Sequence, residues 1–269
     1  MVFQELLTTA KNAARSAGIH AVEAQSRARV ELKPGNHIVT DADKKCQQII
    51  IETISEKWPE HGFIGEEGKN GELYKRHPKK GESVWWVIDP IDGTRNYAHG
   101  SPQFSVSIAA VINGFPRIGV IFDPNSDMLF SAVEGGSAYC NDSIIHCQDG
   151  STESNRQIAF CSSFPEEVGP ALLVLNQEAT LMNLGSAALH FAYVAAGTYT
   201  AALAWDVKLW DIAAGMVIAK SAGAVSTDFE ASDKTPIDCF NYEGQSEPIL
   251  MAPELIHRGL LESLTCKDR

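Results

Sequence analysis

Two aspartates at the end of a short apolar run are the first residues whose types and spacing could do chemistry. The run 86–88 is followed by Asp89 and Asp92, three residues apart, and then by a Gly-Thr turn at 93–94. Such a run predicts a buried strand that delivers acidic groups to a cleft. Carboxylates held so close repel each other unless a cation lies between them. Oxygen ligands with no His or Cys beside them favour Mg²⁺ over zinc.

Pro90 lies between the two aspartates. Proline cannot donate a ladder hydrogen bond, so we expect the strand to end there and the backbone to turn, with both carboxylates near one point.

A further acid, Asp211, heads an alanine-rich segment that we expect to be helical up to about Gly223. An aspartate at a helix start caps free amides and faces the positive end of the helix dipole, which taken alone favours a structural role. Glu66, Asp89 and Asp92, however, need at least one more carboxylate to hold two divalent ions. That need favours Asp211 as a ligand.

The composition limits the classes of partner. The chain has 269 residues, with 22 basic and 34 acidic side chains and a net charge of −12. Direct nucleic-acid binding is not expected, because it needs a basic face that neutralises the backbone. An acidic protein can still bind an anionic phosphate where metal ions supply the positive charge.

Cysteine usage and the N-terminus indicate the compartment. The six cysteines form no Cys-x-x-Cys pair, so neither a zinc site nor a disulfide framework is expected, and a reducing compartment is indicated. Residues 3–17 repeat apolar side chains at helical spacing, which is typical of an amphipathic surface helix and not of a signal peptide. No run approaches the roughly 20 apolar residues of a membrane span. We expect a cytoplasmic protein without a membrane segment.

The pattern along the chain predicts one two-lobed unit, 1–269, with an α+β lobe over about 1–150 and an α/β lobe over about 151–269. We expect a first helix that ends near Gly18 and a second from about Thr40 to Trp58. The remaining expected elements are a turn-rich loop at 33–37, a polar loop at 69–83, strands at 104–112 and 116–122 with a hairpin at 113–114, two further strands, a strand at 157–161 and a helix at 187–196.

Three motifs carry a resemblance that spans nearly the whole chain. Residues 65–67 (GEE), 89–94 (DPIDGT) and 210–215 (WDIAAG) resemble, in order and separation, the signature motifs of the inositol monophosphatase family, and the Thr-x-x-Asp of 40–43 lies upstream of them. The resemblance implies a layered αβαβα sandwich of the inositol monophosphatase/fructose-1,6-bisphosphatase type, usually dimeric. It also implies hydrolysis of small phosphomonoesters with two or three Mg²⁺ ions, and often inhibition by Li⁺.

The resemblance also implies roles for individual residues. Glu66, Asp89 and the carbonyl of Ile91 would bind one ion, and Asp89 would bridge to a second that Asp92 and Asp211 complete. Two ions about 3.5 to 4 Å apart can orient a water and stabilise the leaving oxygen of an in-line displacement, without a phosphoenzyme.

Three further residues are implied to handle the water and the phosphate. Thr94 would hydrogen-bond the attacking water, with Asp43 as its partner and Glu66 as the alternative base. The amides of Gly93 and Thr94 would receive phosphate oxygens. Asp43 could alternatively cap a helix, a role that Asp41 could serve instead.

Departures from the family pattern leave the substrate open. Ala204 stands where inositol phosphatases usually place a glutamate that binds substrate hydroxyls, and Arg95 stands where they commonly carry threonine. A polyol site without polar partners discriminates poorly, and Arg95 could bind a second anionic group. The other candidate substrate contacts are Ser186 and Ala187, in a segment similar to the family's Gly-Thr-Ala, together with Asp206 and the loop residue Lys33. We interpret His99 and His190 as structural.

Four hypotheses follow. The first is a Mg²⁺-dependent phosphatase of inositol 1-phosphate or a related polyol phosphate. The second keeps the chemistry but acts on histidinol phosphate, fructose 1,6-bisphosphate or 3′-phosphoadenosine 5′-phosphate. The third is a regulatory protein that works through an RNA-polymerase or ribosome-assembly partner, and the fourth is a metal-binding protein without turnover. The complete set of acids argues against the fourth.

Overall fold

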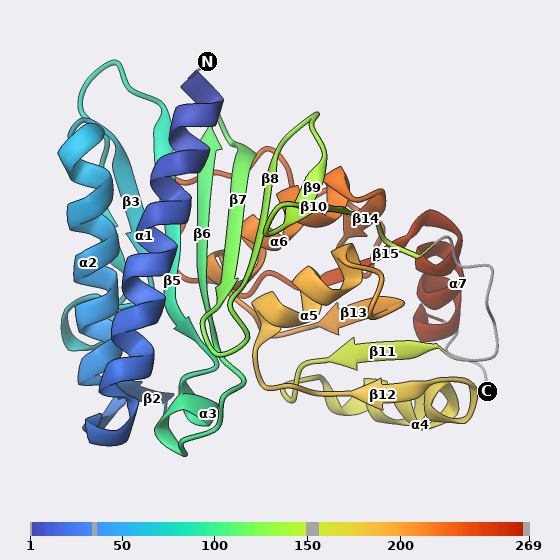
Figure 1. Cartoon of the computed structure of the whole chain (residues 1–269). Coiled ribbons are helices and arrows are strands. Elements are labelled where there is room, and N and C mark those ends of the chain that lie inside the picture. The colour runs from blue at the N-terminus through green and yellow to red at the C-terminus, as the bar shows by residue number, and fades with distance from the viewer. Residues whose placement is uncertain (1, 34–36, 149–155, 266–269) are drawn as a thin grey trace.

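The computed structural model describes residues 2–33, 37–148 and 156–265, which form alternating layers of helices and sheets (Figure 1). Helices α1 (Val2–Ala24) and α2 (Asp41–Lys57) cover the outer face of a large sheet. Helices α5 (Ala187–Ala195) and α6 (Leu209–Ser221) lie between this sheet and a smaller one, whose far face carries α4 (Gly169–Glu178) and α7 (Glu254–Thr265). The expected αβαβα sandwich is confirmed.

The large sheet is mixed and has the strand order β10-β9-β8-β7-β6-β5-β3-β4. Only the β3–β5 pair is parallel among its described pairs. The bounds are β3 (Gly62–Gly65), β4 (Tyr74–Arg76), β5 (Val84–Asp92), β6 (Ser105–Ile112), β7 (Phe115–Asp123), β8 (Met128–Val133), β9 (Ala138–Cys140) and β10 (Ser143–Ile145).

The predicted hairpin at 113–114 is confirmed. Ile112 pairs with Phe115, and both loop residues have positive φ, the two-residue turn that suits the twist of paired strands.

The smaller sheet has the order β12-β11-β13-β15-β14, in which β11 runs parallel to β12 and β13. Its strands are β11 (Gln157–Phe160), β12 (Thr180–Met182), β13 (Ala201–Ala204), β14 (Ala224–Thr227) and β15 (Ile249–Pro253). The remaining elements are a hairpin of β1 (Val30–Lys33) and β2 (His37–Thr40), the short helix α3 (Thr94–Ala98), and the 3₁₀ turns η1 (Gln25–Arg27), η3 (Lys69–Gly71) and η5 (Glu166–Val168).

Hydrophobic clusters fill the spaces between the layers. One lies between α1, α2 and the large sheet, and another packs α5 and α6 against both sheets. Because the second cluster draws on strands from either side of residue 150, we propose that the two lobes form a single unit. None of the helices described by the structure is both long and apolar enough to cross a bilayer.

Three expected element boundaries are wrong. Helix α1 continues past Gly18 to Ala24 because that glycine packs against Phe122, where a Cβ would lie 2.6 Å from the ring. The expected loop at 69–83 contains β4, which pairs with β3 at the edge of the sheet. Strand β5 does not end at Pro90: the ladder is interrupted after Asp89 and resumes where Asp92 pairs with Ser105. The expected loop at 33–37 is the end of the β1–β2 hairpin, of which 34–36 lie outside the described residues.

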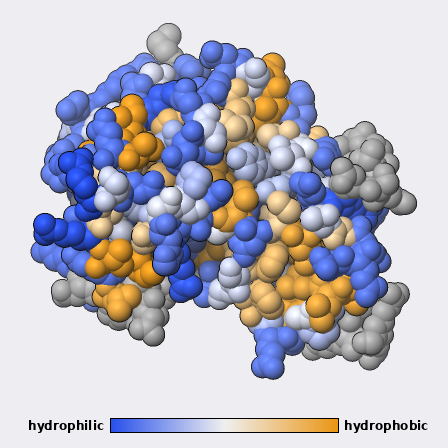
Figure 2. Space-filling model, turned by 60° about the horizontal axis from the view of Figure 1, so that its bottom comes forward, coloured by the Kyte–Doolittle hydropathy of each residue, from blue (hydrophilic) through white to orange (hydrophobic). Residues whose placement is uncertain are grey.

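Figure 2 turns the end of the molecule that carries α3 toward the viewer. The outline is notched between the two halves, and apolar and hydrophilic residues are interspersed on both sides of the notch. Leu32 on β1 and Leu173 on α4 are among the large apolar side chains that remain exposed.

Candidate active site

Asp89 lies where the ladder of β5 breaks. Its Oδ1 accepts a hydrogen bond from the amide of Ile91 at 3.1 Å, and it is buried. This contact turns the backbone around Pro90, which has no amide hydrogen of its own. The ladder is interrupted at Pro90 and resumes at Asp92, two residues after the proline, where the Asp92 carboxylate lies on the side of α5.

Asp92 is held by the start of helix α5. Its Oδ2 accepts the Ser186 hydroxyl and, at 2.7 Å, the amide of Ala188. The free amides of a helix N-terminus attract a carboxylate in this way. Ser186 is 1% exposed and also caps α5 by accepting the amide of Leu189. The Ser186 hydroxyl, a predicted substrate contact, thus lies against Asp92 at the start of α5 in this structure.

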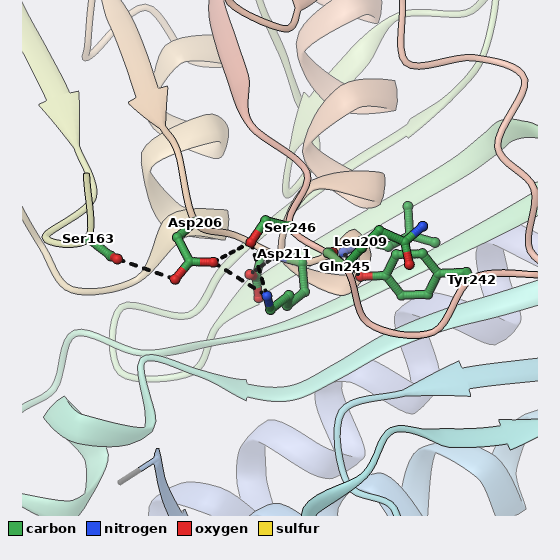
Figure 3. A network of polar contacts seen from close by, with 8 residues as sticks. Ser163, Asp206, Leu209, Asp211, Tyr242, Gln245 and Ser246 are labelled. Carbon is green, nitrogen blue, oxygen red and sulfur yellow. Dashed lines mark hydrogen bonds and ion pairs between the residues drawn. The ribbon is translucent and has the colours of Figure 1, made fainter. Parts of the chain in front are cut away.

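Asp211 occupies the first turn of α6. Its Oδ2 accepts the Lys208 amide at 2.6 Å, so the acid caps the helix, as expected for an aspartate at a helix start. The next amide, from Leu209, donates at 2.8 Å to the hydroxyl of Tyr242, which donates in turn to the carbonyl of Gln245 (Figure 3). These contacts occupy two of the free amides at the start of the helix, and the bond from Lys208 fixes the direction of the Asp211 side chain.

The helix start is also tied to the large sheet. The Ser107 hydroxyl donates to the carbonyl of Trp210 at 3.1 Å, and Ser107 pairs with Asp89 across β5 and β6. One serine therefore connects the strand that carries Asp89 with the turn that carries Asp211.

These three acids converge. Asp89, Asp92 and Asp211 each offer a carboxylate oxygen, and these oxygens lie within 4.8 Å of one another. Burial, followed by the charges of Glu66, Asp92 and Asp211, raises the pKa of Asp89 well above its usual value. Burial and the neighbouring Asp92 raise the pKa of Asp211 to about 8, and burial raises that of Asp92.

Crowded, buried carboxylates are stabilised by a divalent cation, and an all-oxygen donor set suits Mg²⁺. The residues present thus fit a magnesium site. The structure supports metal binding by this cluster.

A second group lies beside the cluster. The Thr94 hydroxyl is 3.0 Å from Asp43 Oδ1 and 3.0 Å from the carbonyl of Ile91. Asp43 is fully buried, and burial raises its pKa to about 6. Its Oδ2 accepts the amide and the hydroxyl of Thr40. Asp43 therefore combines the capping role and the contact with Thr94, whereas Asp41 instead accepts the amide of Arg29.

Glu66 follows β3 and is half-buried. Its charge raises the pKa of Asp43, Asp89 and Asp211, after the larger effect of burial, so it lies within electrostatic range of all three. The side-chain amide of Gln47 holds this segment: it donates to the Glu67 carbonyl at 2.6 Å and accepts the Glu67 amide at 3.0 Å.

Sequence reasoning missed Gln47 and Tyr242. A signal for Gln47 existed, because it lies four residues after Asp43 on the same face of the predicted helix. No local pattern points to Tyr242, which reaches α6 from 33 residues away.

Four proposed substrate contacts differ in their setting. Gly93 forms the left-handed turn before α3, and Arg95 is exposed on the first turn of that helix. Asp206 is exposed and accepts Ser163, Ser246 and Lys208; the Ser246 hydroxyl bond is the main reason that its pKa is lowered. Figure 3 shows Asp206 between Ser163 and Ser246; Lys208 links it to Asp211, since the Lys208 side chain contacts Asp206 and the Lys208 amide contacts Asp211. Lys33 ends β1, and its side chain lies outside what the structure describes.

The expected structural role of His190 agrees with its contacts. It is buried, burial lowers its pKa to about 4, and its Nε2 accepts the amide of Leu184 at 2.9 Å. His99 is exposed at the end of α3.

The sequence matches the inositol monophosphatase family over residues 3–267. This chain belongs to the inositol monophosphatase family. The family match therefore includes every residue of the acidic cluster and both ends of the fold.

Individual members of the inositol monophosphatase family resemble the chain over most of its length. Nus factor SuhB of Pasteurella multocida is 38% identical over 240 residues, 83% of this chain and 85% of that protein. A fructose-1,6-bisphosphatase/inositol-1-monophosphatase of Thermotoga maritima is 35% identical over 206 residues, 76% of this chain and 77% of that protein. The crystal structure of the extragenic suppressor protein suhB from Bartonella henselae has a TM-score of 0.86 at 29% identity and covers 98% of this chain and 100% of its own.

Proposed function

We propose that this protein is a Mg²⁺-dependent phosphomonoesterase that hydrolyses a small polyol or sugar phosphate, of the inositol 1-phosphate type, by direct attack of water. The observation that carries the proposal is the convergence of Asp89, Asp92 and Asp211 beside the Thr94–Asp43 pair. Asp89, Asp92, Asp211, Glu66 and the Ile91 carbonyl are the proposed ligands of two or three ions. When bound, Mg²⁺ would supply the positive charge that neutralises the phosphate and acidifies the nucleophilic water.

The remaining chemistry belongs to Thr94 and Asp43. When the Thr94 hydroxyl donates to ionised Asp43, its lone pairs are free to accept a hydrogen from the attacking water and orient it. A threonine hydroxyl is a weak base, so Asp43 is the proton acceptor of the pair, with Glu66 as the alternative. The amides of Gly93 and Thr94, in the turn that begins α3, would bind phosphate oxygens.

Substrate selection depends on the side of the site near Asp206. Ala204 is fully buried and offers no hydroxyl acceptor. Asp206 already accepts two serine hydroxyls and Lys208, and Arg95 adds an exposed positive charge beside the phosphate turn. These features keep histidinol phosphate, fructose 1,6-bisphosphate and 3′-phosphoadenosine 5′-phosphate as alternative substrates of the same chemistry.

Phosphate release from these four esters, ranked by kcat/KM with Mg²⁺ and with EDTA, tests the proposal. Asp92→Asn should lower kcat by more than the roughly 10- to 100-fold that loss of an outer-shell partner costs. Asp123→Asn is the matched control, because Asp123 is also buried but its carboxylate binds the amides of Asn125 and Ser126 in the turn after β7 and is not part of the acidic cluster. Full activity of Asp92→Asn, or release that EDTA leaves unchanged, would contradict the mechanism.

Three further properties belong to the proposal: the protein is cytoplasmic, it forms a homodimer, and Li⁺ inhibits it. Sedimentation of the purified protein and assays with increasing LiCl test the last two.

The name of several relatives favours a second candidate function. Proteins named Nus factor SuhB are 33% to 38% identical to this chain. A regulatory role through an RNA-polymerase or ribosome-assembly partner would not require turnover. Replacing the chromosomal gene with one encoding Asp92→Asn separates the two functions, provided that deletion of the gene alters growth. If the Asp92→Asn strain grows like the parent strain, regulation is favoured. If it grows like the deletion strain, catalysis is favoured.

A further inference from the structure

Asn96 joins two parts of the chain that are far apart in sequence. Its Nδ2 donates to the carbonyl of Gln103 at 2.7 Å and to the carbonyl of Leu184 at 2.6 Å. The first contact closes the loop after α3, and the second crosses to the segment that leads into α5. Both hydrogens of the amide are therefore used, and neither faces the acidic cluster.

Two glycines, Gly185 and Gly93, allow close packing around Asn96. Gly185 has φ +73°, and a Cβ there would lie 2.7 Å from Asn96 Nδ2. Gly93 has φ +99°, and a Cβ there would lie 3.0 Å from the Gln103 carbonyl and 3.1 Å from the Gly185 carbonyl. The turn that follows Asp92 and the segment before α5 thus contact each other backbone to backbone, an approach that only glycine permits.

The same segment holds Asp92. Directly after Gly185, Ser186 donates its hydroxyl to Asp92 Oδ2, and the amide of Ala188 adds a second bond. Asp92 is therefore fixed from both sides: its own chain continues through Gly93 to Asn96, and Asn96 pins the segment that supplies its hydrogen-bond donors. The loss of Asn96 would free this segment, and with it the orientation of the Asp92 carboxylate.

We propose that Asn96 is a positioning residue for the metal site: it acts on the ligand Asp92 through Leu184 and Ser186, without contacting substrate or metal. The inference rests on the proposed function, because it takes Asp92 as a Mg²⁺ ligand. Residues that orient metal ligands typically contribute about 10- to 100-fold to metal affinity, and this sets the expected scale.

The test compares Asn96→Ala, Asn96→Ser and Asn125→Ala with the unmodified protein. Asn125 is the matched control because its Nδ2 donates to the Pro102 carbonyl at 2.8 Å, in the loop that also contains Gln103, but does not reach Leu184. Isothermal titration calorimetry with Mg²⁺ and no substrate gives the metal affinity. Phosphate release against Mg²⁺ concentration gives the kinetic counterpart, and thermal unfolding reports stability.

We expect Asn96→Ala to weaken Mg²⁺ binding about tenfold or more, to lower kcat at limiting Mg²⁺ and to leave KM for the ester nearly unchanged. Asn96→Ser retains one donor and should fall between. Asn125→Ala should stay within about twofold of the unmodified protein. A purely structural role would lower the unfolding midpoint and the active fraction without moving the Mg²⁺ dependence.

Two outcomes separate the possible failures. Mg²⁺ affinity of folded Asn96→Ala within twofold of the unmodified protein overturns the positioning role, as does an equal loss in Asn125→Ala. If Asn96→Ala does not fold, the affinity of Asn96→Ser decides by the same criterion. If the unmodified protein binds Mg²⁺ but releases no phosphate, the proposed function fails while the calorimetric comparison still tests Asn96.

Discussion

The Thr94 hydroxyl lies 3.0 Å from Asp43 Oδ1, although 51 residues separate them in the chain. The contact joins the first turn of α2 to the first turn of α3, next to the point where β5 delivers Asp89 and Asp92. Thr40 occupies the other oxygen of Asp43, so the carboxylate is held at both ends.

Thr94→Val should lower kcat by on the order of a hundredfold or more, because the isosteric side chain can neither donate to Asp43 nor orient a water. Thr94→Ser keeps the hydroxyl and should retain most of the activity. Phosphate release at saturating Mg²⁺ is the measurement. Equal activity of the valine and serine variants would remove the hydroxyl from the mechanism.

The pH dependence of activity should show an acid limb near pH 6, where Asp43 gains a proton and no longer accepts the Thr94 hydroxyl. Protonation of the carboxylate ligands competes with metal binding. The part of the acid limb that arises from these ligands should therefore move to lower pH as the Mg²⁺ concentration is raised. The part due to Asp43 should stay in place once the metal sites are saturated. Profiles of kcat at several Mg²⁺ concentrations distinguish the two, and a limb that moves entirely with Mg²⁺ would argue against Asp43.

The metal-free protein should lose stability as the pH rises from 6.5 to 8. Burial raises the folded-state pKa of Asp211 to about 8 from its usual 3.8, so the folded state retains a proton that the unfolded chain releases. The unfolding free energy must then fall with rising pH. Asp89 acts in the same direction. The loss from Asp211 is about 1 to 2 kcal/mol, equivalent to a few degrees in the unfolding midpoint.

Three histidines act in the opposite direction near the lower end of this window. Burial lowers the pKa of His61, His190 and His257, so near pH 6.5 the unfolded chain binds protons that the folded state does not. This contribution makes stability rise with pH and is exhausted by about pH 7.5. Mg²⁺ binds the ionised carboxylates and should remove most of the slope. Thermal unfolding in EDTA and in Mg²⁺ checks this, with Asp211→Asn as the control that flattens the EDTA curve. A fall in the EDTA midpoint from pH 6.5 to 8 that is no larger in the unmodified protein than in Asp211→Asn would refute the prediction.

Gly65→Ala should destabilise the protein by roughly 1 to 3 kcal/mol and reduce activity. A Cβ at Gly65 would lie 2.3 Å from Gln47 Oε1, the atom that accepts the Glu67 amide. The displaced amide would release the segment that carries Glu66. Gly169→Ala is the matched control, since a Cβ there meets nothing within 4 Å. Denaturant unfolding and phosphate-release kinetics should show a lower unfolding free energy and activity for Gly65→Ala than for Gly169→Ala. Similar values for both variants would show that the Gln47 side chain can move aside without loss of stability or activity.

Tyr242→Phe should cost about 1 to 3 kcal/mol, because it leaves the buried Leu209 amide without an acceptor. The loosened start of α6 should also weaken Mg²⁺ binding through Asp211. Tyr199→Phe is the comparison, because Tyr199 is buried and its hydroxyl has no hydrogen bond to any described residue. Unfolding and calorimetry measure both effects, and an unchanged Mg²⁺ affinity in Tyr242→Phe would confine Tyr242 to stability.

The sequence pattern predicted most elements, because hydrophobic periodicity and turn residues are local signals, whereas the layered sandwich was implied by the family resemblance. The hairpin at 113–114 and the helix that starts after Thr40 follow from such signals. The failures have a common cause. Helix α1 continues past Gly18, where the missing side chain leaves room for the ring of Phe122. Strand β5 continues past Pro90 because an Asp89 oxygen binds the Ile91 amide and because Ser105 of β6 pairs with Asp92.

By itself, the sequence determined the kind of chemistry: the motifs carry the acids, the threonine and the tight turns, and residue type decides which ion and which group those side chains can bind. Only the tertiary structure decided how each acid is aimed. Asp92 is oriented by Ser186, 94 residues away, and Asp211 shares a helix start that Tyr242 holds from 33 residues away. Orientation depends on hydrogen bonds between segments that meet only when the two sheets enclose α5 and α6, and no local pattern records which segments will meet.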